Sequence, residues 1–319
     1  MKFIQQAYKG DNEWTAYLLT LMLFFFGWQI VGIIPLSLVA YIYAGDMETL
    51  MQSAGKSFSN LGIDANLYLL LVIITFLFGL LSLFLGIKLF HKRKIVTLIT
   101  SREKVDWGRF FYAFVVWGMV GFFMVVIGYF MAPEDYVWNF KPIPFFTLLL
   151  ISFLFLPIQT SMEELLFRGY LMQGFGTWFK NSFAPLILTS AIFGLLHGLN
   201  PEVEKLGWFI MVYYIGTGLV LGIFTLMDEG TELALGFHAA NNIVAAVLVT
   251  TNWTVFQTDA LLVDISEPSI DWEMFVPVFV LYPLILLLFS KKYGWTNWKE
   301  KLFGQVFKPI AFKEEEFIA

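Results

Sequence analysis

The sequence contains no cysteine and is poor in both charged residues and histidine. Without cysteine the chain has no disulfide, no thiolate nucleophile, no cysteine zinc ligand and no lipidated cysteine. Only 14% of the 319 residues are charged, whereas soluble domains average about 25%. No basic stretch interleaved with aromatics suggests nucleic-acid binding. Few polar side chains are therefore left to carry any chemistry.

Apolar residues are abundant instead: 58% of the chain is hydrophobic and 36 residues are Phe. Several apolar runs exceed the ~20 residues that a membrane-spanning helix needs. The first begins near Trp14, is too long for a cleavable signal peptide and lacks an Ala-x-Ala cleavage site. We predict an all-α, polytopic membrane bundle, a single domain over 1–319, with about eight spans at 14–44, 66–90, 107–131, 143–175, 183–199, 206–227, 231–251 and 274–290.

The charges between the spans predict the orientation, because Lys and Arg accumulate on cytoplasmic loops. Basic residues crowd the stretch from Lys88 to Arg109, and Lys291 and Lys292 follow the last span. The loop before that span is acidic and has no Lys or Arg, as an external loop allows; it holds Asp259, Asp264, Glu267, Asp271 and Glu273. Both termini are then cytoplasmic. The tail 293–319 alternates apolar residues and lysines at near-helical spacing and predicts an interfacial helix.

Spans four to seven carry polar side chains that cost a few kcal/mol each at membrane depth. They are Glu163, Glu164, Arg168, His197, His238 and Asn242. Two glycine pairs, Gly194 with Gly198 and Gly218 with Gly222, have the spacing that lets helices approach closely. Packing alone explains these glycines, but close packing also brings the polar groups together, in a core at about 143–251.

Glu163 and Glu164 are helix neighbours, so their side chains point about 100° apart and take different roles. Glu164 lies four residues before Arg168, the favourable order for an ion pair. This leaves Glu163 for general-base work. The structural alternative is that Pro157 interrupts the helix and that the stretch from Ser161 to Glu164 caps its restart, with Glu164 only a cap or ion-pair member.

His197 and Glu163 each lie 17 residues from Lys180, the predicted turn of the hairpin between spans four and five. At about 1.5 Å rise per residue both reach a similar depth, so they can meet if both face inward. His238 and Asn242 share one helix face and can donate two hydrogen bonds to an oxyanion. Taken singly, His197 or the His238–Asn242 pair is equally a helix-association feature; jointly they favour a site.

Three motifs in this order resemble the signature of the CPBP family, which comprises CAAX prenyl proteases of the Rce1 type and bacterial abortive-infection (Abi) relatives. The motifs are Glu163-Glu164-x-x-x-Arg168, Phe193-x-x-x-His197 and His238-x-x-x-Asn242. The resemblance implies an eight-helix intramembrane peptidase, with a bilayer-associated peptide or protein substrate and a bacterial inner-membrane location. It implies that Glu163 and His197 activate water, that His238 and Asn242 stabilise the oxyanion, and that Glu164 and Arg168 fix the helix.

Metal dependence stays open at this point. Glu163, His197 and His238 are the residue types of a His₂Glu zinc site, in which case the base is another group such as Glu164. We favour direct glutamate catalysis with no required cofactor. The sequence has no H-E-x-x-H and no G-x-S-x-G. A proton- or ion-coupled transporter and a non-catalytic immunity protein are the alternative functions; the oligomeric state is open.

Overall fold

The computed structural model describes residues 2–55, 58–254, 257–270 and 272–309. Asp271 of the predicted acidic loop and the last part of the predicted tail lie outside them. The helices are α1 (Trp14–Phe25), α2 (Ile34–Ala44), α3 (Met47–Ala54), α4 (Ala65–Leu89), α5 (Val96–Ile99), α6 (Trp107–Met131), α7 (Pro142–Glu164), α8 (Met172–Phe179), α9 (Phe183–Leu196), α10 (Pro201–Leu206), α11 (Met211–Asp228), α12 (Glu232–Val247), α13 (Tyr282–Tyr293) and α14 (Trp298–Phe303). The strands are β1 (Tyr136–Trp138), β2 (Val249–Thr250) and β3 (Leu262–Asp264).

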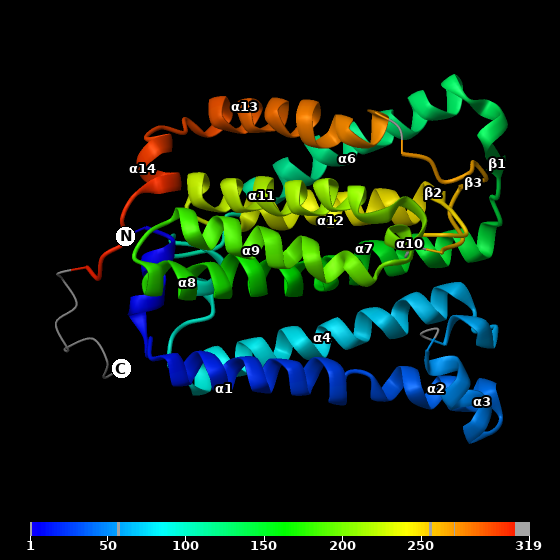
Figure 1. Cartoon of the computed structure of the whole chain (residues 1–319), viewed down its shortest axis with the longest axis horizontal. Coiled ribbons are helices and arrows are strands. Elements are labelled where there is room, and N and C mark those ends of the chain that lie inside the picture. Colours follow the sequence, from blue (N-terminus) through cyan, green and yellow to red (C-terminus); the bar gives the residue numbers. More distant parts are fainter. Residues whose placement is uncertain (1, 56–57, 255–256, 271, 310–319) are drawn as a thin grey trace.

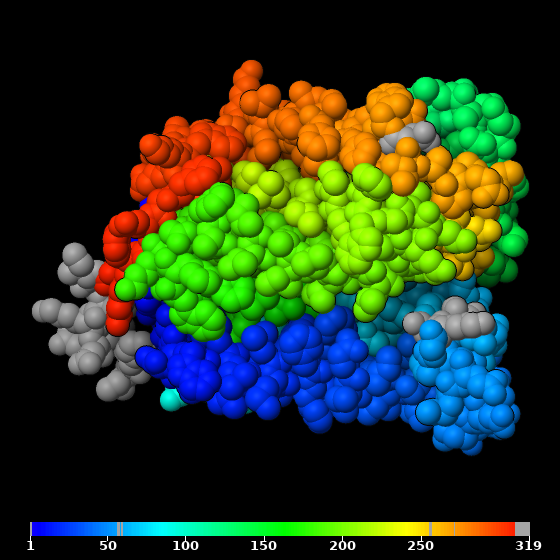
Figure 2. Space-filling view, in the orientation of Figure 1, coloured from blue at the N-terminus to red at the C-terminus, as the bar shows by residue number. Residues whose placement is uncertain are grey.

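The long helices run side by side along the longest axis of the molecule (Figure 1). The N-terminal end of the chain and α14 lie at one end of this bundle, while α3 and the three strands lie at the other. On the face shown in Figure 2, the segment from α8 to α11 forms a middle band between α1 and α13. The prediction of a helical polytopic membrane bundle is confirmed.

The structure gives fewer membrane-length helices than the sequence predicts. Within the described residues, six helical stretches are long and apolar enough to cross a membrane: Trp14–Ala44, Ala65–Leu89, Trp107–Met131, Pro142–Phe179, Pro201–Asp228 and Trp272–Tyr293. The other two predicted spans are helical but shorter, at 17 residues for Phe183–Leu199 and 16 for α12. The count of eight is therefore not confirmed.

Helix α12 forms the centre of the bundle. It packs against α6, α7 and α11, and most of its side chains are buried. Small residues make this possible: a Cβ on Gly236 would lie 2.0 Å from the backbone oxygen of Phe110 in α6. Because α12 carries His238 and Asn242, this central position places both side chains inside the protein.

Close packing also joins α9 to α11, as the glycine pairs predict. A Cβ on Gly194 would lie 2.4 Å from the Ile215 side chain and 2.9 Å from its backbone nitrogen. A Cβ on Gly218 would lie 2.8 Å from the backbone oxygen of Ser190. Gly198 differs, because a Cβ added there would lie 3.6 Å from the Trp208 side chain, which is an ordinary van der Waals distance.

Short polar signals set the ends of the helices. The Asp64 carboxylate accepts from the backbone N–H of Leu67 at the start of α4, and Asp106 caps α6 in the same way. Lys180, which ends α8 with φ 55°, makes the predicted turn into α9. At the opposite end, β3 pairs antiparallel with β1 and parallel with β2, a small sheet that the all-α prediction did not include.

Ion pairs hold the elements together at the end where the N-terminal segment lies. The buried carboxylate of Asp228 accepts from Arg102 at 2.9 Å and from Arg109 at 2.8 Å. Trp295 donates to the same carboxylate at 3.2 Å. The predicted amphipathic helix after span eight is the six-residue α14, whose apolar side chains pack on the protein; its interfacial position stays a prediction.

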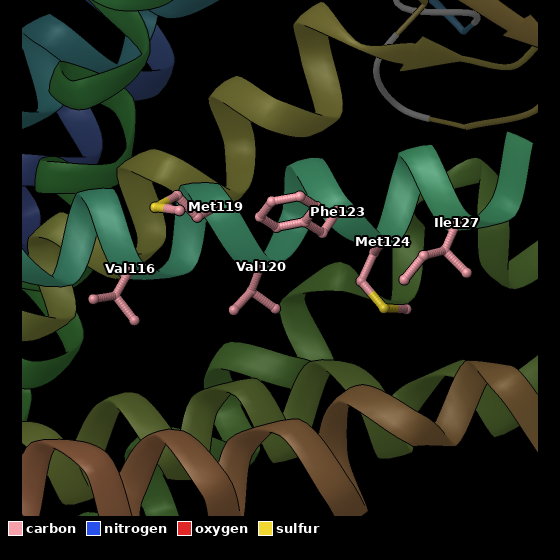
Figure 3. Close-up of a pocket in the computed structure, with 6 residues that line it drawn as sticks. All are labelled: Val116, Met119, Val120, Phe123, Met124 and Ile127. Atoms are coloured by element: carbon pink, nitrogen blue, oxygen red, sulfur yellow. The ribbon is translucent and has the colours of Figure 1, made fainter.

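An apolar groove of about 440 Å³ runs along one face of α6 (Figure 3). Its lining side chains are Val116, Met119, Val120, Phe123, Met124 and Ile127. None of them is ionisable or polar, so the groove has no group that could carry out acid–base chemistry. The polar cluster lies elsewhere, among α7, α9 and α12.

Gly194→Ala tests the close approach of α9 to α11. We expect a loss of about 1–3 kcal/mol of stability, because the added methyl group meets the backbone of Ile215 and not only its flexible side chain. Gly198→Ala is the matched control, since its methyl group has ordinary contact distances. The measurement is thermal unfolding in detergent; equal losses in the two variants would contradict the packing described here.

Candidate functional site

The first motif lies on one continuous helical stretch. α7 runs through Pro157 without a break and passes at Leu165 into a π-helical segment, Leu165–Leu171, that leads to α8. No side-chain cap forms at the start of that segment. The capping interpretation of Glu164 is therefore wrong. Segments of π-helix are frequent at functional sites, and this one carries Arg168.

Glu164 joins Arg168 and His238 in the interior of the bundle. Arg168 Nη1 donates to Glu164 Oε1 at 2.8 Å, and both side chains are fully buried. His238 Nδ1 lies 2.7 Å from the same oxygen. Arg168 also donates to the backbone oxygen of Gly218 in α11 at 3.2 Å. The predicted ion pair is confirmed, and it extends to a third group from α12.

Glu163 points in a different direction, as its helical position requires. Its Oε1 accepts from Gln159 at 2.5 Å. Its Oε2 lies 3.6 Å from His238 Nε2 and makes no hydrogen bond within the described part of the chain. The Glu163 side chain is 15% exposed. One carboxylate oxygen is therefore held by an amide, and the other faces the imidazole.

Asn242 joins this arrangement from α12. Its Nδ2 donates to Gln159 Oε1 at 2.9 Å, and its Oδ1 accepts from Asn241 at 3.2 Å. Asn241 in turn accepts from the indole of Trp117 in α6 at 3.1 Å. The side chain of Asn242 thus lies at the cluster, as predicted, and Gln159 links it to Glu163.

His197 does not make the predicted contact with Glu163. Its Nδ1 bonds to the backbone oxygen of Phe193 at 2.8 Å, and its ring stacks on Tyr214 with the centroids 4.5 Å apart. Within the described residues no hydrogen bond or ion pair joins it to Glu163. The reason is local: α9 ends at Leu196, and a histidine at that end turns back to satisfy a free backbone carbonyl.

Phe193 separates the two motif histidines. Its ring centroid lies 4.7 Å from that of His197 and 5.9 Å from that of His238. Its face also receives the Arg168 guanidinium at 4.3 Å, a cation–π contact worth more in a desolvated place than in water. The phenyl ring therefore closes one side of the cluster.

The contact with Glu164 orients the imidazole ring of His238. An ionised carboxylate only accepts hydrogen bonds, so the Nδ1 that bonds to Glu164 carries a proton. The Nε2 atom on the other side of the ring then faces Glu163 Oε2, at 3.6 Å.

The proposed zinc ligands are not gathered. No group of three or more acidic or histidine side chains that could hold a metal ion occurs among the residues that the structure describes. Glu163 and His238 are neighbours, but His197 is turned to Phe193 and Tyr214. The alternative His₂Glu set does not fit this arrangement, so no chemical step is derived through a metal.

Sequence reasoning missed two side chains of the cluster, Gln159 and Tyr214. Gln159 lies one helical turn before Glu163 and is nearly buried, at 9% exposed. An amide at that spacing inside an apolar span is the signal that could have identified it. The contact of Tyr214 with His197 joins two different helices, and no spacing rule within one helix predicts it.

Two comparisons with known proteins extend this description. The profile of the type II CAAX prenyl endopeptidase Rce1-like family matches residues 142–244. An uncharacterized protein of Bacillus subtilis (strain 168), YyaK, is 30% identical over 285 residues, which cover 86% of this chain and 93% of that protein. No solved structure matches the chain.

Glu164→Gln and Glu163→Gln test the different roles of the two glutamates. Glu164→Gln leaves Arg168 buried without its counter-charge, and removing one partner of a buried pair costs about 3–5 kcal/mol. Glu163→Gln keeps an oxygen for Gln159 and should change stability little. Thermal unfolding of both variants is the measurement. Equal destabilisation would contradict this division of roles.

Proposed function

Because the chain belongs to the type II CAAX prenyl endopeptidase Rce1-like family, we propose that it is a membrane endopeptidase that hydrolyses a peptide bond of a membrane-associated peptide or protein. The observation that carries the proposal is the pairing of Glu163 Oε2 with His238 Nε2 at 3.6 Å inside the bundle. A carboxylate that can take a proton and an imidazole that can donate a hydrogen bond, facing one position, are what peptide hydrolysis requires of a site. Asn242, linked to Glu163 through Gln159, adds a second donor.

In this proposal Glu163 acts as the general base. A water molecule bound at Glu163 Oε2 gives a proton to the carboxylate as its oxygen attacks the carbonyl carbon of the scissile bond. The negative charge that forms on the carbonyl oxygen is stabilised by hydrogen bonds from His238 and Asn242. When the C–N bond breaks, the leaving amine takes the proton from Glu163, which restores the ionised carboxylate.

His197 is kept as a helper of Glu163 in the substrate complex. Its Nδ1 bonds to a carbonyl oxygen and so carries the proton in the neutral ring, which leaves Nε2 as an acceptor. Catalytic hydrogen bonds are often long in the free enzyme and tighten on substrate binding. The stacking contact with Tyr214 is the interaction that the ring has to leave for this role.

The proposal includes the cellular membrane in which the enzyme lies and its orientation there. We place it in the bacterial inner membrane, with the end of the bundle that holds the N-terminal segment, Lys94 and α14 in the cytoplasm. The support is the basic residues at this end, which the positive-inside rule puts on the cytoplasmic side. The partners are then the bilayer and a membrane-anchored substrate.

Asn242→Ala tests the proposed chemistry. The amide contributes mainly when charge develops in the transition state, so kcat should fall about 10²–10³-fold while KM changes little. The assay is turnover of a membrane-tethered peptide, with a prenylated CAAX peptide as the first probe. The matched control is Asn66→Ala, a buried asparagine that bonds to Pro144 and Asp259 far along the bundle. Unchanged kcat in Asn242→Ala would contradict the oxyanion role.

Single cysteines test the orientation, since the chain has none of its own. Cysteine at Asp264, the last residue of β3, should react with an impermeant thiol reagent on intact cells. Cysteine at Lys94 should react only after the membrane is permeabilised. The reverse pattern would refute the proposed orientation without bearing on the chemistry.

A further inference from the structure

We propose that Gln159 is a positioning residue that couples the base to an oxyanion donor. It binds the carboxylate of Glu163 and the amide of Asn242 at the same time, so the two catalytic groups are aligned as a unit. This inference rests on the proposed function and deepens it. Neither the three sequence motifs nor the similarity to the family assigns a role to Gln159.

The geometry requires both ends of a primary amide. Gln159 Nε2 donates to Glu163 Oε1 at 2.5 Å, and Gln159 Oε1 accepts from Asn242 Nδ2 at 2.9 Å. A carboxylate at this position cannot donate, and an ammonium cannot accept. Among the common side chains of this length, only glutamine satisfies both partners near neutral pH.

The indole N–H of Trp117 on α6 fixes the direction of the hydrogen bonds that lead to Gln159. The indole N–H of Trp117 can only donate, so Asn241 presents its oxygen to Trp117 and its nitrogen to Asn242. Asn242 must then use its oxygen on that side and its nitrogen toward Gln159. The carboxylate of Glu163, which only accepts, ends the series. Each amide therefore has one orientation, and Nδ2 of Asn242 is directed toward Gln159 and Glu163.

The consequence for Glu163 is that its two oxygens are not equivalent. Oε1 is occupied by Gln159, which directs Oε2 toward His238. The charged or titratable groups near this carboxylate are Glu164 on α7, Arg168 on the π-helical segment and His238 on α12, while His197 at the end of α9 is turned to Tyr214. None of them bonds to Oε1, so Gln159 is the group that holds it.

Gln159→Ala is the first test. Without the amide the carboxylate and Asn242 are no longer aligned, and a misplacement of this kind lowers kcat about 10²-fold with little change in KM. Gln173→Ala is the matched control, because Gln173 is a fully buried glutamine that bonds to Arg93 and Thr97. The Gln173→Ala variant should be less stable than wild type, but its folded fraction should have the wild-type kcat. Equal kcat in Gln159→Ala and wild type would overturn the proposal.

Gln159→Glu is a variant whose activity depends on a proton. At 2.5 Å two carboxylates cannot both be ionised readily, so they share one proton. While position 159 holds that proton, it can donate to Glu163 and accept from Asn242 as glutamine does. Turnover should therefore persist at low pH and fall at a pH where wild type stays active. A pH profile parallel to wild type would contradict the coupling.

Infrared spectroscopy separates this inference from the proposed function. Gln159→Glu should show a carboxylic-acid C=O band near neutral pH that disappears on alkalinisation, whether or not any peptide is cleaved. Gln173→Glu, beside Arg93, should remain ionised and show none. Absence of the band in Gln159→Glu would refute the contact itself. A wild-type protein that cleaves no peptide while the variant shows the band would refute the proposed function and leave the contact standing.

Discussion

The structure of the site depends on a single buried interaction, the contact of Glu164 with both Arg168 and His238. A guanidinium and a carboxylate inside a membrane protein are tolerated because they neutralise each other. Here the same carboxylate oxygen also bonds to an imidazole from a second helix. That bond joins α7 to α12 and fixes which nitrogen of His238 faces Glu163. The chemistry proposed for Glu163 is possible only because its neighbour has taken the structural role.

The fold supplies the positions that this interaction needs. Small residues let α6 approach α12 and let α9 approach α11, so polar side chains from different helices meet inside the bundle. In lipid there is no hydrophobic driving force between helices, and close backbone approach with interhelical hydrogen bonds takes its place. The hydrogen bonds that run from Trp117 through Asn241 and Asn242 to Gln159 include interhelical contacts of this kind. They hold the helices together and also orient the amide of Asn242.

Much of this could be predicted from the sequence. Long apolar runs indicated the bundle, the separation of Glu164 and Arg168 indicated their pair, and glycine spacing indicated the contact of α9 with α11. These are local patterns within one helix, and helix geometry converts them directly into positions. Three motifs in order also indicated the family.

What the sequence did not predict depends on contacts between helices or on helix ends. His197 and Glu163 were expected to meet because they lie at similar depth, but depth says nothing of how the last residue of a helix turns. The contact of His238 with Glu164 was not anticipated either, because a rotation of α12 decides it. Gln159 was overlooked because a single amide in an apolar run is an inconspicuous signal.

The central claim is that this cluster hydrolyses peptide bonds with Glu163 as the base. The most direct measurement is cleavage of a membrane-tethered peptide by purified protein whose metal content has been determined, with Glu163→Gln compared at equal folded fraction. The account predicts turnover by wild-type protein without stoichiometric zinc, and none above background by Glu163→Gln. Full activity of Glu163→Gln, or zinc lost in step with wild-type activity, would contradict it.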